Sequence, residues 1–329
     1  MAANSVKFLK LWEHTHCRPV DSVSLAGDSG DVVISDNRDR LALINPNGGV
    51  VWDHKLDFAP LESRITADGS MIYVLTTQGK LMKITRDAEL EWEHFVDRDG
   101  KTLAVKAGGQ SAVVASHKGR FHVMSAGGER ARIVHTQEPV AFARFAPRSG
   151  GFFVAGALGW IGYYNSKFDP VSELSLGRTI FDLKVSSRGA GVYLALKEEG
   201  FCFVDMAESQ LTTVNPGFQV VRIGVDESGA LIAAAGFDGE LTALNRQGEY
   251  LWSAKSARPV VFVEMALDGS RIVTVTDKGV VSCYGAGHGV AVAEPEKPEP
   301  KPELKKEPRP APTPKEKKPG ENDFDYLEL

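Results

Sequence analysis

A short turn that ends in glycine recurs about every forty residues along this chain. It ends at Gly79, Gly119, Gly159, Gly200, Gly239 and Gly279, and a second series with the same spacing runs through Gly30, Gly69, Gly109, Gly150, Gly189, Gly229 and Gly269. Glycine readily adopts the positive φ that tight hairpin turns require, so two glycine turns per period indicate repeated antiparallel strands.

The segments between these turns have the composition of strands. They are runs of four to eight residues rich in valine, isoleucine, leucine, phenylalanine and threonine, and no helical period precedes residue 290. Each period divides into four strands, which we name a to d. Seven copies of strand a are expected to begin near residues 20, 60, 102, 140, 180, 220 and 260.

The seventh copy lacks its strand d, because the pattern stops at Tyr284. The N-terminal segment around Trp12 matches the outer strands around Trp52 and Trp92, which follow it at intervals of forty residues. We therefore expect the N-terminal strand to complete the last sheet. Such closure leaves only short, protected sheet edges.

The repeats resemble those of a known superfamily. Strand a followed by Asp-Gly, as in Glu264–Gly269, resembles the WD-repeat pattern, and the Gly-x-x-x-Trp segments Gly48–Trp52 and Gly248–Trp252 are similar to PQQ-like repeats. The resemblance, which covers about residues 6–284, is to the β-propeller repeat superfamily. The expected fold is all-β: a seven-bladed β-propeller of four-stranded blades over residues 1–288, closed by the N-terminal strand.

The composition changes after the repeats. Residues 289–320 are rich in proline, lysine and glutamate, which predicts a disordered linker with polyproline-II character. Residues 321–329 combine acidic with apolar side chains, and we interpret them as a docking motif that acts through Phe324, Tyr326, Leu327 and Leu329. The alternative is a frayed terminus without a role.

Charge and cysteine content limit the partners and the cellular compartment that we expect for this chain. A net charge of −5 and the lack of a long apolar run favour neither nucleic acid nor membrane insertion. Cys17, Cys202 and Cys283 are far apart, which suggests buried reduced thiols rather than a disulfide framework. The first residues lack the apolar stretch of a secretory signal, so we expect a cytoplasmic protein. A third possibility is a propeller that takes part in envelope assembly, and such a protein would need an export signal.

The inner strands carry a series of polar residues between apolar neighbours. Its members are Ser24, Arg64, Lys106, Arg144, Lys184, Arg222 and Glu264. If the apolar neighbours pack between blades, the series points into the axial channel. The cations Arg64, Lys106, Arg144, Lys184 and Arg222 are therefore candidates for binding an anion. The alternative is that these long side chains extend into channel water and are partly paired.

One face of the disc is expected to combine the d-to-a connections with the b-to-c turns. An accessible tryptophan beside arginines has the composition of an interaction hot spot. We accordingly predict a partner-binding surface, whose residues are Arg18, Trp160, Arg178, Phe237 and Arg258. The alternative for Trp160 is a core position at the start of a strand.

Metal and catalytic chemistry find little support. The Trp-Asp/Glu-His triplets of the outer strands are best interpreted as packing between blades, and His14, His16 and Cys17 form only a weak local metal set. There is no P-loop, nucleophile elbow or zinc-spaced Cys/His pair, and the adjacent cysteines of many quinoprotein dehydrogenases are missing. We expect no metal, cofactor or catalytic residue.

These observations favour a non-catalytic protein-interaction scaffold. The propeller, a monomer within a larger complex, would bind one protein partner through its face, and the tethered C-terminal peptide would dock on another. The alternative is a propeller enzyme or a small-anion sensor that uses the basic central channel.

Overall fold

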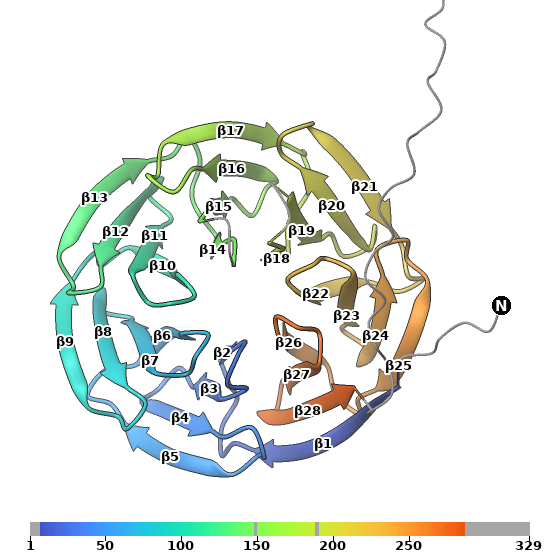
Figure 1. Ribbon diagram of the computed structural model, residues 1–329, viewed down its shortest axis with the longest axis horizontal. Helices are drawn as coiled ribbons and strands as arrows, with labels where there is room; N and C mark the ends of the chain where they lie inside the picture. Colours follow the sequence, from blue (N-terminus) through green and yellow to red (C-terminus); the bar gives the residue numbers. More distant parts are fainter. Residues whose placement is uncertain (1–6, 148–149, 188–190, 287–329) are drawn as a thin grey trace, which may run out of the picture. The chain divides into compact units, whose positions relative to one another are not determined.

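The described part of the chain is a ring of seven β-sheets. The computed structural model describes residues 7–147, 150–187 and 191–286, and within these ranges 28 strands form seven antiparallel sheets of four strands each, without a helix. The sheets stand around a common axis like the blades of a propeller (Figure 1). This is the seven-bladed β-propeller that the glycine spacing predicted.

The blades are numbered along the chain. Blade 1 contains β2 (Ser22–Leu25), β3 (Val32–Ser35), β4 (Arg40–Ile44) and β5 (Val50–Lys55). Blade 2 contains β6 (Pro60–Ile65), β7 (Met71–Thr76), β8 (Lys80–Thr85) and β9 (Leu90–Phe95). Blade 3 contains β10 (Gly100–Val105), β11 (Ser111–Ser116), β12 (Arg120–Ser125) and β13 (Arg130–His135). Blade 4 contains β14 (Phe142–Phe145), β15 (Phe152–Ala155), β16 (Trp160–Tyr164) and β17 (Pro170–Ser175).

The remaining blades complete the ring. Blade 5 contains β18 (Asp182–Val185), β19 (Gly191–Ala195), β20 (Phe201–Asp205) and β21 (Gln210–Val214). Blade 6 contains β22 (Val220–Val225), β23 (Leu231–Gly236), β24 (Glu240–Asn245) and β25 (Tyr250–Lys255). Blade 7 contains β26 (Val260–Met265), β27 (Arg271–Thr276), β28 (Val280–Ala286) and the N-terminal β1 (Phe8–Thr15).

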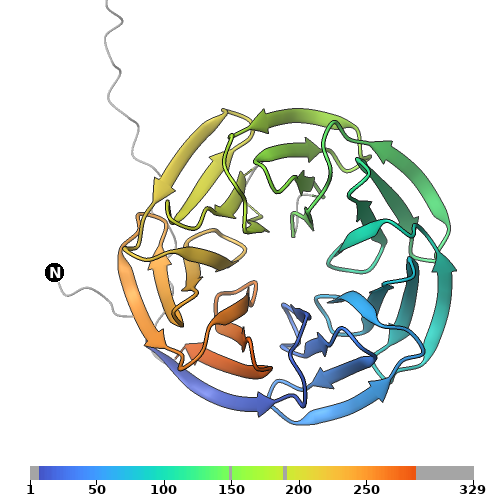
Figure 2. The same cartoon turned by 180° about the vertical axis from the view of Figure 1, so that it is seen from behind.

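The ring is closed by β1, as the tryptophan spacing predicted. This strand pairs antiparallel with β28, from Phe8 opposite Ala286 to Thr15 opposite Val280. Both views of the ring show β1 lying along β28 next to blade 1 (Figures 1 and 2). The first strand of the chain is thus the outer strand of its last blade.

The hydrophobic core lies between neighbouring blades. The middle strands are almost fully buried, as in β3 and β15, whereas outer strands such as β5 and β9 are largely exposed. Burial raises the pKa of the Cys202 thiol to about 12 and that of Cys283 to about 11. Cys17 is exposed, so the expectation of three buried thiols is wrong for this residue, which lies in the connection after β1.

The predicted linker (289–320) and docking motif (321–329) lie outside the described residues.

Candidate functional site

One face of the disc is formed by the b-to-c turns and the d-to-a connections, as the sequence predicted. At the end of several outer strands, the backbone donates a hydrogen bond to the glycine carbonyl of the b-to-c turn. Examples are His16 N to Gly279 O (3.0 Å), Thr136 N to Gly119 O (2.9 Å) and Ser256 N to Gly239 O (2.8 Å). We call this surface the connection face.

Two apolar side chains project from turns of the connection face. Phe237 is 46% exposed and Leu158 is 79% exposed. Each turn packs closely on an arginine-bearing connection, since a Cβ added to Gly239 or Gly159 would lie 3.0 Å from Arg258 O or 2.6 Å from Arg178 O. The turns that carry Phe237 and Leu158 therefore lie beside the backbone of Arg258 and Arg178, two of the predicted arginines.

The three predicted arginines of this face are ion-paired. Arg178 Nη1 lies 2.6 Å from Glu199 Oε2, and Arg258 Nε lies 3.5 Å from Asp277 Oδ1. Arg18 Nη1 contacts Asp39 Oδ1 at 2.9 Å and the buried Asp36 at 3.3 Å. Carboxylates thus hold all three guanidinium groups close to the surface of the disc.

The prediction that Trp160 is an accessible contact is wrong. Its side chain is only 7% exposed and belongs to the core between blades 3 and 4, and its indole Nε1 lies 3.3 Å from Glu173 Oε2. The exposed residue is Leu158, two positions earlier. The sequence carried a signal for it, because the same turn position holds a polar residue in other copies, such as Gln78, Lys118 and Asp238.

The axial channel contains a cavity of about 210 Å³. Its walls come from the beginnings of the inner strands, next to the d-to-a connections, so the cavity lies toward the connection face. The lining charged side chains are Asp21, Glu62, Arg64, Lys101, Arg144, Asp182, Lys184, Arg222 and Glu264. Apolar side chains, among them Phe142, Phe181 and Phe262, lie between them.

Strand pairing corrects the predicted register of the channel series. Arg64, Arg144, Lys184 and Glu264 each pair with a residue nine positions further on, and Ala104 and Gly224 occupy the same place in blades 3 and 6. Lys106 follows the end of β10, in the a-to-b turn, and is not among the lining residues. Arg222 does line the cavity, but from the position that Glu62 and Asp182 hold in their blades.

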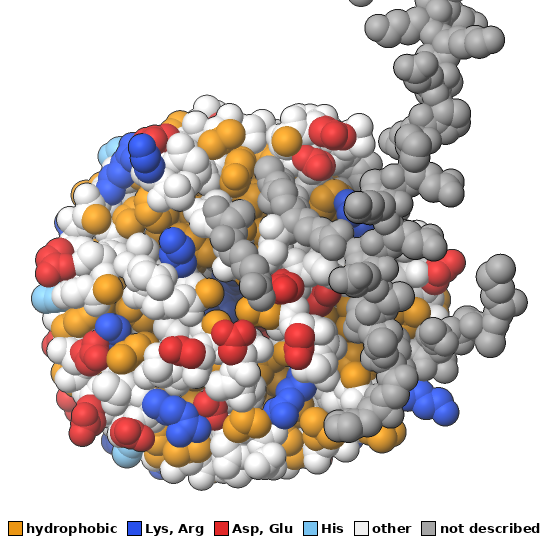
Figure 3. Space-filling view, in the orientation of Figure 1, with side chains coloured by type: hydrophobic (Ala, Val, Ile, Leu, Met, Phe, Trp, Pro, Cys, Tyr) orange, Lys and Arg blue, Asp and Glu red, His pale blue; other side chains and the backbone are white. Residues whose placement is uncertain are grey.

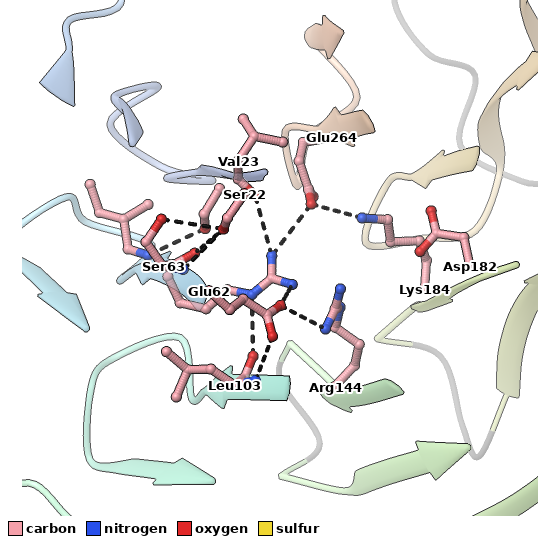
Figure 4. A network of polar contacts seen from close by, with 12 residues as sticks. Ser22, Val23, Glu62, Ser63, Leu103, Arg144, Asp182, Lys184 and Glu264 are labelled. Atoms are coloured by element: carbon pink, nitrogen blue, oxygen red, sulfur yellow. Dashed lines mark hydrogen bonds and ion pairs between the residues drawn. The ribbon is translucent and has the colours of Figure 1, made fainter. Parts of the chain in front are cut away.

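A network of ion pairs connects opposite sides of the cavity (Figure 4). Arg64 contacts Glu62 directly, and its Nη1 lies 3.5 Å from Glu264 Oε1. Lys184 Nζ donates to the same Glu264 oxygen at 2.8 Å. Glu62 also accepts a hydrogen bond from Leu103 N at 2.6 Å. Four side chains from blades 2, 5 and 7 are thereby linked across the axis.

The pKa values of the network follow from burial and charge. Burial raises the pKa of Glu62, but the positive charges of Arg64 and Arg144 outweigh it and hold that pKa below its usual range. Burial also raises the pKa of Glu264, but positive charges, above all that of Lys184, outweigh it and hold this pKa below its usual range. Burial and the charge of Arg64 lower the pKa of Arg144, whose nearest carboxylate contact is Glu62 at 3.7 Å. Arg144 is therefore the least compensated cation of the network.

The channel is close to neutral overall. Five lining cations face four lining carboxylates, a formal excess of one positive charge. Arg222 donates to three backbone carbonyls, those of Val261 (2.6 Å), Phe181 (3.0 Å) and Val221 (2.8 Å). Red and blue side chains both stand near the centre of the disc on the side seen in Figure 3. Four of the five predicted cations line the cavity, and the partial pairing that the sequence left as the alternative is present for Arg64, Arg144 and Lys184.

The structure offers no metal centre among the residues that it describes: no three His, Cys, Asp or Glu side chains gather as ligands. The outer-strand tryptophans instead bond to the neighbouring blade, as in the 2.8 Å hydrogen bond from Trp52 Nε1 to Arg86 O. Packing is thus confirmed as their role. No helix within the described ranges is long and apolar enough to cross a bilayer.

Fold and site together define a seven-bladed propeller with a polar, largely ion-paired central cavity. The repeats within residues 9–137 are similar to PQQ-like repeats: a model of this repeat family, described as outer membrane protein assembly factor BamB, matches these residues. The match covers less than half of the chain, mainly β1 and blades 1 to 3. No curated protein matches the sequence.

Proposed function

We propose that this protein is a non-catalytic interaction scaffold whose connection face binds a protein partner. The observation that carries the proposal is the exposure of Leu158 and Phe237 at turn tips next to arginine-bearing connections. A large apolar side chain at a solvent-exposed turn gains no burial in the isolated chain. Interface cores, by contrast, are enriched in aromatic and arginine side chains. The PQQ-like repeats and the propeller fold are compatible with such a role.

The proposal keeps two elements that rest on the sequence alone. Residues 321–329 would dock on a second protein, and residues 289–320 would tether them, which raises the local concentration of that protein at the disc. The expected location is the cytoplasm, and three free cysteines support it, because thiols persist in reducing compartments.

The test of the face compares matched surface variants. The full-length double variant Leu158→Asp/Phe237→Asp is used to capture partners from native extract, next to Leu90→Asp/Val171→Asp on exposed outer strands. We expect quantitative mass spectrometry to show a loss of about tenfold or more in partner recovery for the first pair only. Equal recovery by both variants and the wild type would refute the face as the binding surface.

The proposed role of the C-terminal residues 290–329, the tail, is tested separately with a chain that ends at Gly289. Partners that depend on the tail should disappear with it, whereas those of the connection face should remain. A partner set unchanged by the truncation contradicts a docking role for residues 321–329.

A small-anion sensor is the second candidate, and Arg144 favours it. This buried cation has one carboxylate contact, at 3.7 Å, so an anion bound in the cavity would compensate its positive charge. The candidate requires that phosphate raise the melting temperature more than chloride at equal ionic strength, and that Arg144→Gln abolish the difference. The same melting temperature in both salts eliminates it.

A further inference from the structure

The outer-strand tryptophans mark a repeated contact between neighbouring blades. The indole Nε1 of Trp12, Trp52 and Trp92 donates to a carbonyl 34 residues further on, those of Pro46 (3.0 Å), Arg86 (2.8 Å) and Ala126 (3.0 Å). Each acceptor belongs to the c-to-d turn of the next blade. An indole thus fills the rim between blades and satisfies one backbone acceptor.

Blade 3 keeps this bond without a tryptophan. Arg132 occupies the corresponding position, opposite Val123, and its Nη1 donates to Lys167 O at 2.6 Å in the c-to-d turn of blade 4. Blade 3 thus retains the donor to the neighbouring turn without the indole, whereas in blade 4 Ser172 holds this position and its Oγ has no hydrogen-bond partner among the described residues.

Blade 5 lacks both the indole and the donor. Thr212 lies opposite Phe203, as Trp52 lies opposite Leu43. The matching acceptor is the carbonyl of Arg246, in the turn between β24 and β25, and it receives no hydrogen bond within the described part of the chain. A threonine is too small to fill the place of an indole.

A pocket occupies this position at the rim. Its volume is about 320 Å³, and its lining residues are Tyr193, Phe201, Phe203, Thr212, Thr213, Val214, Arg246 and Gln247. This is the lower end of the range for ligand pockets, about 300 to 1,000 Å³, and suits one large side chain. Tyr193 Oη already donates to Gly229 O at 3.0 Å, so its ring serves as apolar wall.

Arg246 gives this rim pocket a charge preference. Its guanidinium lies 4.3 Å from the centroid of the Phe203 ring, and no carboxylate of the described residues lies within ion-pairing distance of it. Arginine stacked on an aromatic ring keeps its N–H groups available in the ring plane for a carboxylate. An acidic residue next to the side chain that occupies the pocket would therefore complement the positive charge of Arg246.

We propose that the rim pocket between blades 5 and 6 binds a tryptophan side chain of a partner protein, flanked by an acidic residue. The partner's indole takes the place that the chain's own tryptophans hold at other junctions. It packs on Phe203 and Tyr193 and donates its N–H to the carbonyl of Arg246, while the acidic residue pairs with the guanidinium. This site is independent of the connection face.

The test uses a short acetylated peptide, Ser-Asp-Trp-Glu-Ser amide, and full-length protein, with ligand-observed NMR titration as the measurement. We expect binding that is lost when the peptide tryptophan is replaced by alanine. Thr212→Trp, which fills the pocket with an internal indole, is expected to weaken binding by about tenfold or more. Leu211→Trp is the matched control, because it adds an indole on the same strand outside the pocket and should change the affinity less than about twofold.

Arg246→Gln keeps the test decisive if Thr212→Trp folds poorly. This variant is expected to weaken binding of the acidic peptide by about threefold to tenfold, and binding of a Ser-Ser-Trp-Ser-Ser peptide by a smaller factor, because only the acidic peptide loses a charge pair. The proposal is overturned if the alanine peptide binds as well as the tryptophan peptide, or if folded Thr212→Trp binds like the wild type.

Discussion

Asp97 is a buried carboxylate in the connection between blades 2 and 3. It accepts two hydrogen bonds from Arg120, at 2.9 and 3.1 Å, and lies 2.9 Å from His122 Nε2. Burial raises the pKa of Asp97, but the bonds from Arg120, Asp99 N and His122 outweigh it and hold that pKa far below its usual range. The charged carboxylate therefore stabilises the folded state.

The sign of the pH dependence follows from this shift. In the unfolded chain Asp97 has an ordinary pKa near 4, so its stabilisation is complete above that pH and is lost as the pH falls toward the folded-state pKa. We expect Asp97→Asn to lower the free energy of unfolding by about 3 kcal/mol at pH 7 and by clearly less at pH 3. Urea denaturation at both pH values measures the difference.

The exposed Asp169, paired with Arg132 at 2.9 Å, provides the control. Asp169→Asn is expected to change the urea midpoint little at either pH, because solvent screens exposed ion pairs. A pH-independent effect of Asp97→Asn would contradict the electrostatic explanation.

At single residues, sequence reasoning failed where strand register decides the outcome. The position of Arg64 recurs every forty residues and falls on Ala104 and Gly224, whereas the predicted series contains Lys106 and Arg222, each two residues away from that position. Trp160 was predicted to be accessible because it follows a turn, but it is the first residue of β16 and its side chain is buried, whereas Leu158 in the turn itself is exposed. Glu264 contacts Arg64 and Lys184, which belong to other blades, and such a contact leaves no local signal in the sequence.

Whole elements were easier to predict, because each blade repeats the same constraints. The glycine turns and alternating apolar residues located all seven inner strands, and tryptophans located four of the outer strands, β1, β5, β9 and β25. Within an outer strand the tryptophan combines burial with one hydrogen bond. Trp52 Nε1 donates to Arg86 O at 2.8 Å, and the ring stacks on His54 with centroids 5.1 Å apart.

Two substitutions separate these contributions. We expect Trp52→Phe to cost about 1 kcal/mol for the lost hydrogen bond, and Trp52→Ala about 3 kcal/mol because the space between blades is left empty. The neighbouring Val51, which is exposed, serves as control through Val51→Ala. Urea midpoints give all three values, and equal costs for both Trp52 variants would show that ring packing contributes nothing.

For the molecule as a whole, closure through β1 determines whether the ring can be stable. Phe8 is buried next to Trp252 of blade 6, and Trp12 contacts blade 1 through Pro46 O, so β1 joins blade 7 to both neighbours. Without β1, the edge of β28 would be unpaired, and neither aromatic side chain would connect blade 7 to the blades beside it. An exposed strand edge of this kind promotes pairing with another chain.

Deletion of residues 1–15 therefore affects more than one blade. The loss of two large aromatic side chains costs several kcal/mol, about 3 to 5 for each, which is comparable to the whole stability of many proteins. We expect a melting temperature at least about 10 °C lower, or association through β28, whereas deletion of residues 1–6 leaves both properties unchanged. Circular dichroism and size-exclusion chromatography measure them, and a monomer of wild-type melting temperature after loss of β1 would show that the ring is held without its closing strand.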